Sequence, residues 1–151
     1  MTWILSRRSQ TIKERTKNMG MYTGLRFKVT VKEKYRKMLD EILNSDKHLE
    51  WGVYEGTPFT TEWKEYSRSG FIPWGCVCYM PDEWGDNINQ YDKQTGIWQV
   101  VCSLKNYNDT IEYFSENVLA KIIEDFDYIE ALYEEDDAPY ISIKKDVLAN
   151  A

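Results

Sequence analysis

LRFKVTVKEKYRKMLDEILN, residues 25–44, decides the fold. Its apolar residues first recur with the two-residue period of a strand and then with the 3.6-residue period of a helix. In its first seven residues the apolar side chains alternate with Arg26, Lys28 and Thr30. This alternation predicts a half-buried strand over Leu25–Val31 with a basic outer face. From Lys32 to Asn44 the apolar residues recur at helical spacing, which predicts an amphipathic helix.

Further elements are predicted outward from this stretch by the same periods and by turn residues. In chain order they are a short helix over Thr60–Ser67 begun by Pro58 and a threonine cap, a strand over Cys76–Met80, a strand over Ile97–Leu104 after a turn at residues 92–96, a helix over Thr110–Glu124, and a hairpin joining Tyr128–Glu134 to Pro139–Lys144. Asn108 or Asp109 is the expected N-cap of the second long helix.

The order strand, helix, strand, strand, helix, strand is typical of a ferredoxin-like βαββαβ two-layer sandwich. We therefore expect an α+β fold of this kind, with an extra C-terminal strand and an insertion, Ser45–Ile72, after the first helix. Both helices would cover one face of the antiparallel sheet, and the other face would be open to solvent or a partner. Residues 1–20 are expected to form a basic, flexible tail, and residues 21–151 a single domain.

Charge divides the chain into two unequal parts. Residues 1–48 carry twelve Lys or Arg and five Asp or Glu, a net charge of +7, whereas the remaining 103 residues carry seven and twenty, a net charge of −13. Three cysteines, an odd number, argue against a disulfide framework and favour a reducing cytoplasm. The sequence shows no secretion signal and no apolar run that approaches the roughly 20 residues needed to span a bilayer.

Few residues offer catalytic or metal-binding chemistry. Cys76, Cys78 and Cys102 could form a zinc site with His48, the only histidine, but two cysteines alternating on a flat strand do not have the spacing of a zinc knuckle. Small buried side chains facing a helix are the simpler interpretation. No nucleophile–histidine signature surrounds His48. We therefore predict no catalytic residues and no cofactor, and the question whether the protein is an enzyme stays open, leaning against it.

The most distinctive stretch is FIPWGCVCYMPDEWGD, residues 71–86, in which prolines, glycines and tryptophans punctuate a very short strand. Such residues predict loops of fixed shape, and tryptophan and tyrosine are the usual anchors of a binding surface. The predicted partner-contacting residues are Trp74, Tyr79, Asp82, Trp84 and Asp86, with an electrostatic rim formed by Glu134, Glu135, Asp136 and Asp137.

A nucleic-acid surface would need stacking aromatics among the basic residues. The first strand offers Arg26 and Lys28 without an aromatic between them, and the acidic balance of the domain opposes phosphate binding. Direct binding of nucleic acid is therefore not expected. The acidic surface near the C-terminus could instead occupy a basic groove and imitate the phosphates of DNA.

Four segments together resemble small uncharacterised proteins encoded by tailed phages and prophages. They are MYTGLRFK at Met21–Lys28, IPWG at Ile72–Gly75, YMPDEWGD at Tyr79–Asp86 and CSLKNYNDTIEYF at Cys102–Phe114. The resemblance covers most of Met21–Glu135 and implies no activity and no catalytic residues. It implies the cytoplasm of a bacterial host and action by binding host machinery.

The leading hypothesis is a protein that binds a host protein, one that handles nucleic acid, through the acidic and aromatic surface. The first alternative is a small-molecule or nucleotide-binding module with a pocket beside Trp74 and Trp84, in which Lys105 or Arg26 would hold an anion. The second is a metal-dependent hydrolase that uses Asp82, Asp86 and Asp92. A homodimer across the open sheet face is compatible with all three.

Overall fold

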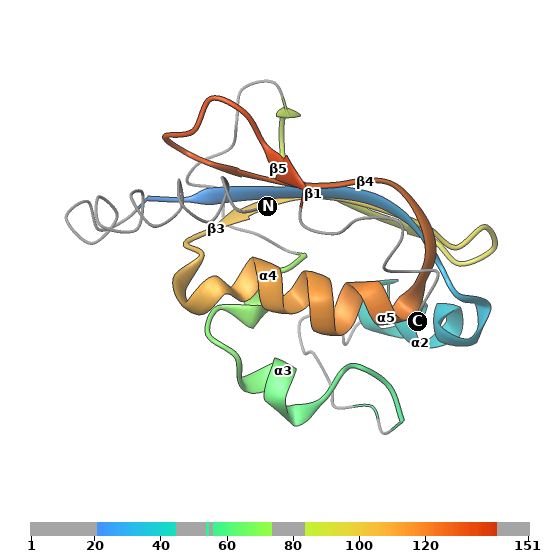
Figure 1. The fold of residues 1–151 in the computed structure, drawn as a ribbon. Helices are drawn as coiled ribbons and strands as arrows, with labels where there is room; N and C mark the ends of the chain where they lie inside the picture. Colours follow the sequence, from blue (N-terminus) through green and yellow to red (C-terminus); the bar gives the residue numbers. More distant parts are fainter. Residues whose placement is uncertain (1–20, 45–53, 55, 74–83, 142–151) are drawn as a thin grey trace.

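The computed structural model describes residues 21–44, 54, 56–73 and 84–141. In this part of the chain a five-stranded sheet, in the order β2-β3-β1-β4-β5, carries helices on one face (Figure 1). Every pair of neighbouring strands is antiparallel. The predicted α+β class is therefore confirmed.

The strands are β1 (Thr23–Val31), β2 (Ile88–Asp92), β3 (Ile97–Leu104), β4 (Ile123–Tyr133) and β5 (Tyr140–Ile141). β1 lies at the centre, with Leu25 opposite Cys102 of β3 and Ala131 of β4. The apolar residues of β1 are buried, whereas Arg26 and Lys28 are half-buried, as the alternation predicted. Since side chains alternate between the faces of a strand, the two basic residues lie on the face away from the helices.

The described helices are α2 (Glu33–Asn44), α3 (Thr61–Glu65), and a longer helix made of α4 (Thr110–Phe114), a π-helical turn (Ser115–Leu119) and α5 (Ala120–Ile122). Short 3₁₀ turns occur at Ser69–Phe71 and Tyr107–Asp109. The helix from α4 to α5 lies along the sheet, and α3 lies on the outer side of it (Figure 1). Among the described residues, no helix is both long enough and apolar enough to cross a membrane.

Local signals predicted several elements well. The strand expected over Leu25–Val31 and the helix expected over Lys32–Asn44 are β1 and α2, and β3 has the predicted bounds. The threonine cap of the short helix is Thr60, whose Oγ1 accepts a hydrogen bond from the Trp63 backbone amide at 3.2 Å.

The helix predicted over Thr110–Glu124 begins at the predicted residue, Thr110, but its C-terminal end and its N-terminal cap differ from the prediction. It stops at Ile122, because Ile123 has extended backbone (φ −104°, ψ 151°) and begins β4. Asn108 and Asp109 adopt left-handed backbone at the start, and neither side chain caps the helix. The cap comes from Asn106, whose Oδ1 accepts a hydrogen bond from the Ile111 amide at 2.7 Å.

The strand pattern of the middle segment also differs from the prediction. The sheet contains β2 at Ile88–Asp92, a stretch for which no strand was predicted, while Cys76–Met80 lies outside the described residues. The closing hairpin is present around the turn at residues 134–139, but its first strand begins at Ile123 instead of Tyr128.

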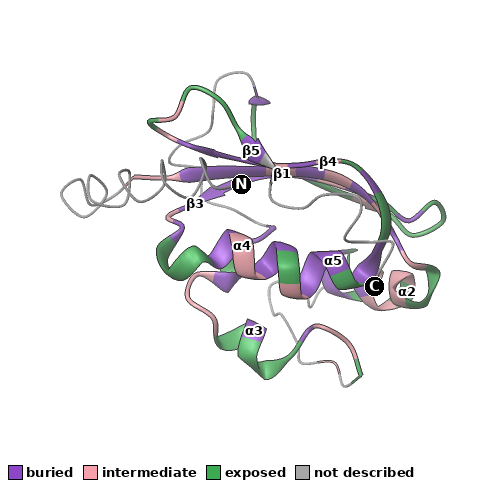
Figure 2. Ribbon diagram, in the orientation of Figure 1, coloured by how far each residue is buried: buried purple, intermediate pink, exposed green. Residues whose placement is uncertain are grey.

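An aromatic cluster forms the centre of the core between sheet and helices. The ring of Phe114 on α4 lies 6.1 Å from that of Phe27 on β1, 6.5 Å from that of Trp98 on β3 and 5.2 Å from that of Trp63 on α3. All four side chains are buried. The buried side of the long helix accordingly faces the sheet, and its exposed residues face outward (Figure 2).

Candidate interaction surface

The four carboxylates expected to form an electrostatic rim lie in the turn between β4 and β5, which we name the acidic turn (Glu134–Asp137). Glu135 and Asp137 are exposed, and Glu134 and Asp136 are half-buried. Within the described part of the chain, no ion pair is formed by Glu135 or Asp137. Exposed carboxylates such as these can attract a basic surface over several ångströms.

Tyr22, the residue before β1, holds the acidic turn in place through hydrogen bonds. The amide of Tyr22 donates a hydrogen bond to Glu134 Oε2 at 3.0 Å, and the Glu134 amide donates one to the Tyr22 carbonyl at 3.0 Å. The amide of Asp136 donates to the Tyr133 carbonyl at 2.9 Å. These bonds limit the entropy that the turn would lose on binding a partner.

Trp84 lies close to the acidic turn, on the sheet face away from the helices. It packs against Val101 and Leu132, and Leu132 is two residues before Glu134 on β4. Only 9% of Trp84 is exposed, so its ring adds little accessible surface of its own. Asp86, two residues later, is exposed. The structure thus brings one of the predicted contact residues, Trp84, near the predicted rim, whereas Trp74, Tyr79 and Asp82 lie outside the described residues.

Arg26 fills the space beside Trp84. Its guanidinium carbon lies 4.7 Å from the centroid of the Trp84 ring and 5.3 Å from that of Tyr128, and its Nη2 forms an ion pair with Glu130 at 3.0 Å. Lys105, the other cation predicted to hold an anion, lies with its Nζ 5.6 Å from the centroid of the Tyr22 ring. The two cations therefore contact different aromatic rings and do not converge on one site.

A second group of side chains, which the sequence did not predict, is formed by the half-buried Arg68 and the exposed Phe71 and Tyr107. We name it the aromatic patch. Phe71 is 36% exposed and Tyr107 is 42% exposed. The guanidinium carbon of Arg68 lies 4.9 Å from the centroid of the Tyr107 ring and 6.0 Å from that of Phe71. Arginine and tyrosine are two of the residue types that most often carry the binding energy of an interface.

The backbone of the aromatic patch is strained. Arg68, Asn108 and Asp109 have φ between 54° and 61° and are the non-glycine residues with positive φ in the described part of the chain. Hydrogen bonds hold the two loops together in this conformation. Tyr66 Oη donates to the Asn108 carbonyl at 2.6 Å, and Thr110 Oγ1 donates to the Ser67 carbonyl at 2.5 Å. Left-handed backbone at such residues costs free energy and occurs preferentially at functional sites.

The aromatic patch and the acidic turn lie at the same end of the sheet. Thr23, the first residue of β1, pairs with Leu104, the last residue of β3, and with Tyr133, the last residue of β4. Tyr107 follows three residues after Leu104, and the acidic turn follows directly after Tyr133. A signal for the patch in the sequence is the polar NYND stretch between a strand and a helix, which leaves Tyr107 without an apolar neighbour on either side.

The groups considered for metal or thiol chemistry are not assembled in the described part of the chain. There, no three His, Cys, Asp or Glu side chains are placed to hold a metal ion. Asp86 and Asp92 are exposed, and Asp82, Cys76, Cys78 and His48 lie outside the described residues. Cys102 is fully buried, and this burial raises the pKa of its thiol to about 12. A neutral buried thiol is unreactive.

A comparison with models of protein families found no match, and comparisons with curated proteins and with solved structures found none either.

Proposed function

We propose that this chain is a binding protein that docks on a basic protein through the acidic turn and the aromatic patch. The observation that carries the proposal is that two exposed aromatic rings, Tyr107 and Phe71, lie at the end of the sheet that also presents the acidic turn. Exposed aromatic rings supply contact area, and the carboxylates supply long-range attraction and orientation.

The charge of the acidic turn favours a partner with a basic surface. Proteins that handle nucleic acid present such surfaces, and the resemblance of the sequence to phage proteins supports a host protein of this class. The predicted residue Asp86, which is exposed, would extend the contact, and the largely buried Trp84 ring would support it from beneath. Arg26 supports them because it stacks on Trp84 while it is held by Glu130.

The order of the strands supports the finer fold prediction, which we keep as part of this proposal. β3 lies between β1 and β2, and helices follow both β1 and β3 in the chain. This order supports a split βαβ arrangement as in a ferredoxin-like sandwich, to which β5 would be added next to β4.

The first test is affinity capture from bacterial lysate with the full chain, with and without nuclease. A host protein retained in stoichiometric amount after nuclease treatment supports the proposal. Capture that depends on nucleic acid contradicts it and points to the basic residues of β1 and α2, such as Lys28 and Lys34.

The second test measures association with the captured partner. The pair Glu135→Lys and Asp137→Lys should lower the association rate by about tenfold or more at low salt, and the loss should shrink as salt screens the charges. The matched control, Glu41→Lys with Glu116→Lys, changes the net charge equally at exposed positions elsewhere. Tyr107→Ala should mainly accelerate dissociation, by about fivefold or more. Equal effects of the two charge-reversal pairs would exclude the acidic turn as the contact.

A further inference from the structure

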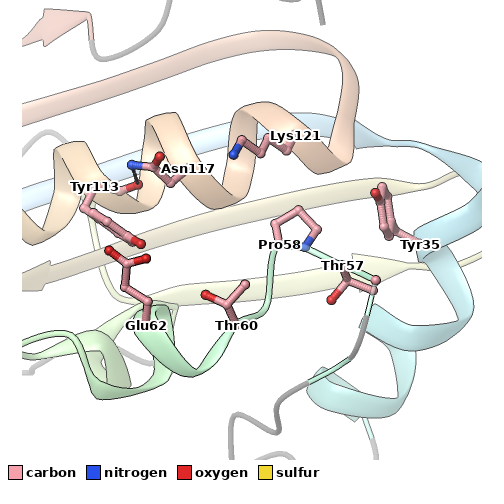
Figure 3. A pocket seen from close by; sticks show the side chains of 9 residues that line it. Tyr35, Thr57, Pro58, Thr60, Glu62, Tyr113, Asn117 and Lys121 are labelled. Atoms are coloured by element: carbon pink, nitrogen blue, oxygen red, sulfur yellow. Dashed lines mark hydrogen bonds between the residues drawn. The ribbon is translucent and has the colours of Figure 1, made fainter.

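A cavity of about 370 Å³ opens on the helical side of the molecule, away from the open face of the sheet (Figure 3). Its walls come from Tyr35 on α2, the segment 56–60, Glu62 on α3, and Tyr113, Asn117 and Lys121 on the long helix. Ligand pockets in proteins have volumes of about 300–1,000 Å³, so a small molecule fits here.

The two ends of the cavity carry opposite charges. At one end Tyr113 faces the carboxylate of Glu62, and the pKa of Tyr113 is raised by burial and, to a smaller extent, by that carboxylate. At the other end the ammonium group of Lys121 extends along the helix towards Asn117 (Figure 3). Within the described residues, the Lys121 ammonium forms no ion pair. Each end can therefore bind an ion of opposite sign.

Polar groups between the two ends can bind amides. Asn117 lies in the π-helical turn, and its Nδ2 donates one hydrogen bond, to the Tyr113 carbonyl at 3.2 Å. Its second N–H and its Oδ1 can pair with a peptide group. The Thr60 hydroxyl accepts from the Trp63 amide, which leaves its own hydrogen for donation. π-helical turns occur frequently at functional sites.

The separation of the charged ends sets the length of the ligand. Tyr113, which faces Glu62 at the first end, and Lys121 are eight residues apart on one helix. This corresponds to at most about 12 Å along the helix axis, because the π-helical turn between them rises less per residue than an α-helix. The inward-pointing side chains shorten the gap between them (Figure 3). An extended tripeptide spans roughly 10 Å, whereas the charges of a single amino acid lie too close together to reach both ends.

We propose that this cavity binds a short free peptide of two or three residues, with its ammonium at Glu62, its carboxylate at Lys121 and a peptide group at Asn117. This site shares no residue with the acidic turn or the aromatic patch. Its test therefore does not depend on whether the partner proposed above exists. Each charged terminus of the peptide meets the end of the cavity that carries the opposite charge.

Titration calorimetry of the full chain with tri-alanine tests the proposal. Free tri-alanine should bind with a dissociation constant on the order of 1 mM or below. N-acetylated tri-alanine and tri-alanine amide, which each lack one terminal charge, should bind about tenfold more weakly or not at all.

Two variants test which terminus of the peptide binds at which end of the cavity. Lys121→Gln should bind free tri-alanine and its amide equally weakly, and Glu62→Gln should no longer distinguish free from acetylated tri-alanine. Lys64→Gln and Glu65→Gln are the matched controls, since both side chains are exposed on α3 and neither lines the cavity. Absence of binding by tri-alanine at millimolar concentration, or equal binding of the capped peptides, would overturn the proposal.

Discussion

Arg36 connects four separate parts of the chain through one side chain. Its Nε donates to the Val31 carbonyl at 2.9 Å and its Nη1 to the Gln94 carbonyl at 3.3 Å. Its Nη2 forms an ion pair with Glu124 at 3.4 Å. A planar guanidinium can serve several acceptors at fixed angles, which a lysine ammonium cannot do in the same geometry. Arg36 thus ties α2 to the end of β1, to the turn before β3 and to the start of β4.

The buried Cys102 thiol should make the protein less stable at alkaline pH. In the unfolded chain a thiol loses its proton near pH 8.5, whereas the folded protein keeps the Cys102 proton up to about pH 12. Between these values the unfolded state binds fewer protons, so the free energy of unfolding falls as pH rises. The loss should reach several kcal/mol by pH 12. Urea denaturation between pH 7 and 11 measures it.

Cys102→Ala is the variant that isolates this effect, because it removes the thiol and keeps a small apolar side chain. Its free energy of unfolding should depend less steeply on pH above 9 than that of the wild type. Tyr91, whose pKa is raised to about 12 mainly by burial, contributes in the same direction. Tyr91→Phe therefore serves as the second comparison. Identical pH profiles for Cys102→Ala and the wild type would contradict the prediction.

At the scale of elements, the turn between β2 and β3 depends on one glycine. Gly96 has φ +79° and its amide donates to the Asp92 carbonyl at 2.8 Å. Its carbonyl accepts a hydrogen bond from the Val31 amide at 2.8 Å, which joins the turn to the end of β1. Glycine adopts this backbone region without the steric cost that a Cβ brings.

Gly96→Ala should therefore destabilise the protein by about 1–3 kcal/mol. An added Cβ would lie 2.4 Å from Arg36 Nε, so the arginine must also leave its present position. Gly70→Ala is the control, because a Cβ at Gly70 meets no atom within 4 Å and its φ is not positive. Chemical denaturation should show a change below about 0.5 kcal/mol for Gly70→Ala. Similar losses for the two variants would refute the assigned role of Gly96.

The long helix shows what an element-level pattern leaves open. Its buried stripe, which includes Ile111, Phe114 and Val118, was predictable from the spacing of apolar residues. The π-helical turn and the end at Ile122 were not, because both depend on how the helix packs and on β4 pairing with β1. The cap by Asn106 was not predictable either, because the left-handed backbone of Asn108 and Asp109 leaves the Asn106 side chain, and not theirs, at the Ile111 amide.

At the scale of the whole molecule, Phe114 is the residue through which sheet and helices share one core. Phe114→Ala should lower the free energy of unfolding by about 3–5 kcal/mol. Phe71→Ala, the same truncation at an exposed ring, should have a much smaller effect. Far-ultraviolet circular dichroism and tryptophan fluorescence should still report one common denaturation midpoint in Phe114→Ala. Two separate midpoints would show that sheet and helices do not unfold as a unit.

The candidate interaction surface was predictable only in part. The acidic turn was predictable because its four consecutive acidic residues and the ends of the two flanking strands lie within about ten positions of the sequence. The aromatic patch was missed because Arg68 and Tyr107 are 39 residues apart in the sequence. β2 was missed because an edge strand with mostly exposed side chains lacks the alternation of burial that reveals strands such as β1.

The sequence by itself determined β1, α2, α3 and β3, because the period of apolar residues and a local cap depend only on neighbours within a few positions. Tertiary structure alone decided that the acidic turn and the aromatic patch lie at the same end of the sheet. This placement depends on the register of β1 with β3 and β4, which brings Leu104 and Tyr133 to opposite sides of Thr23. Register is fixed by how whole strands bury their apolar faces together, and no short segment contains that information.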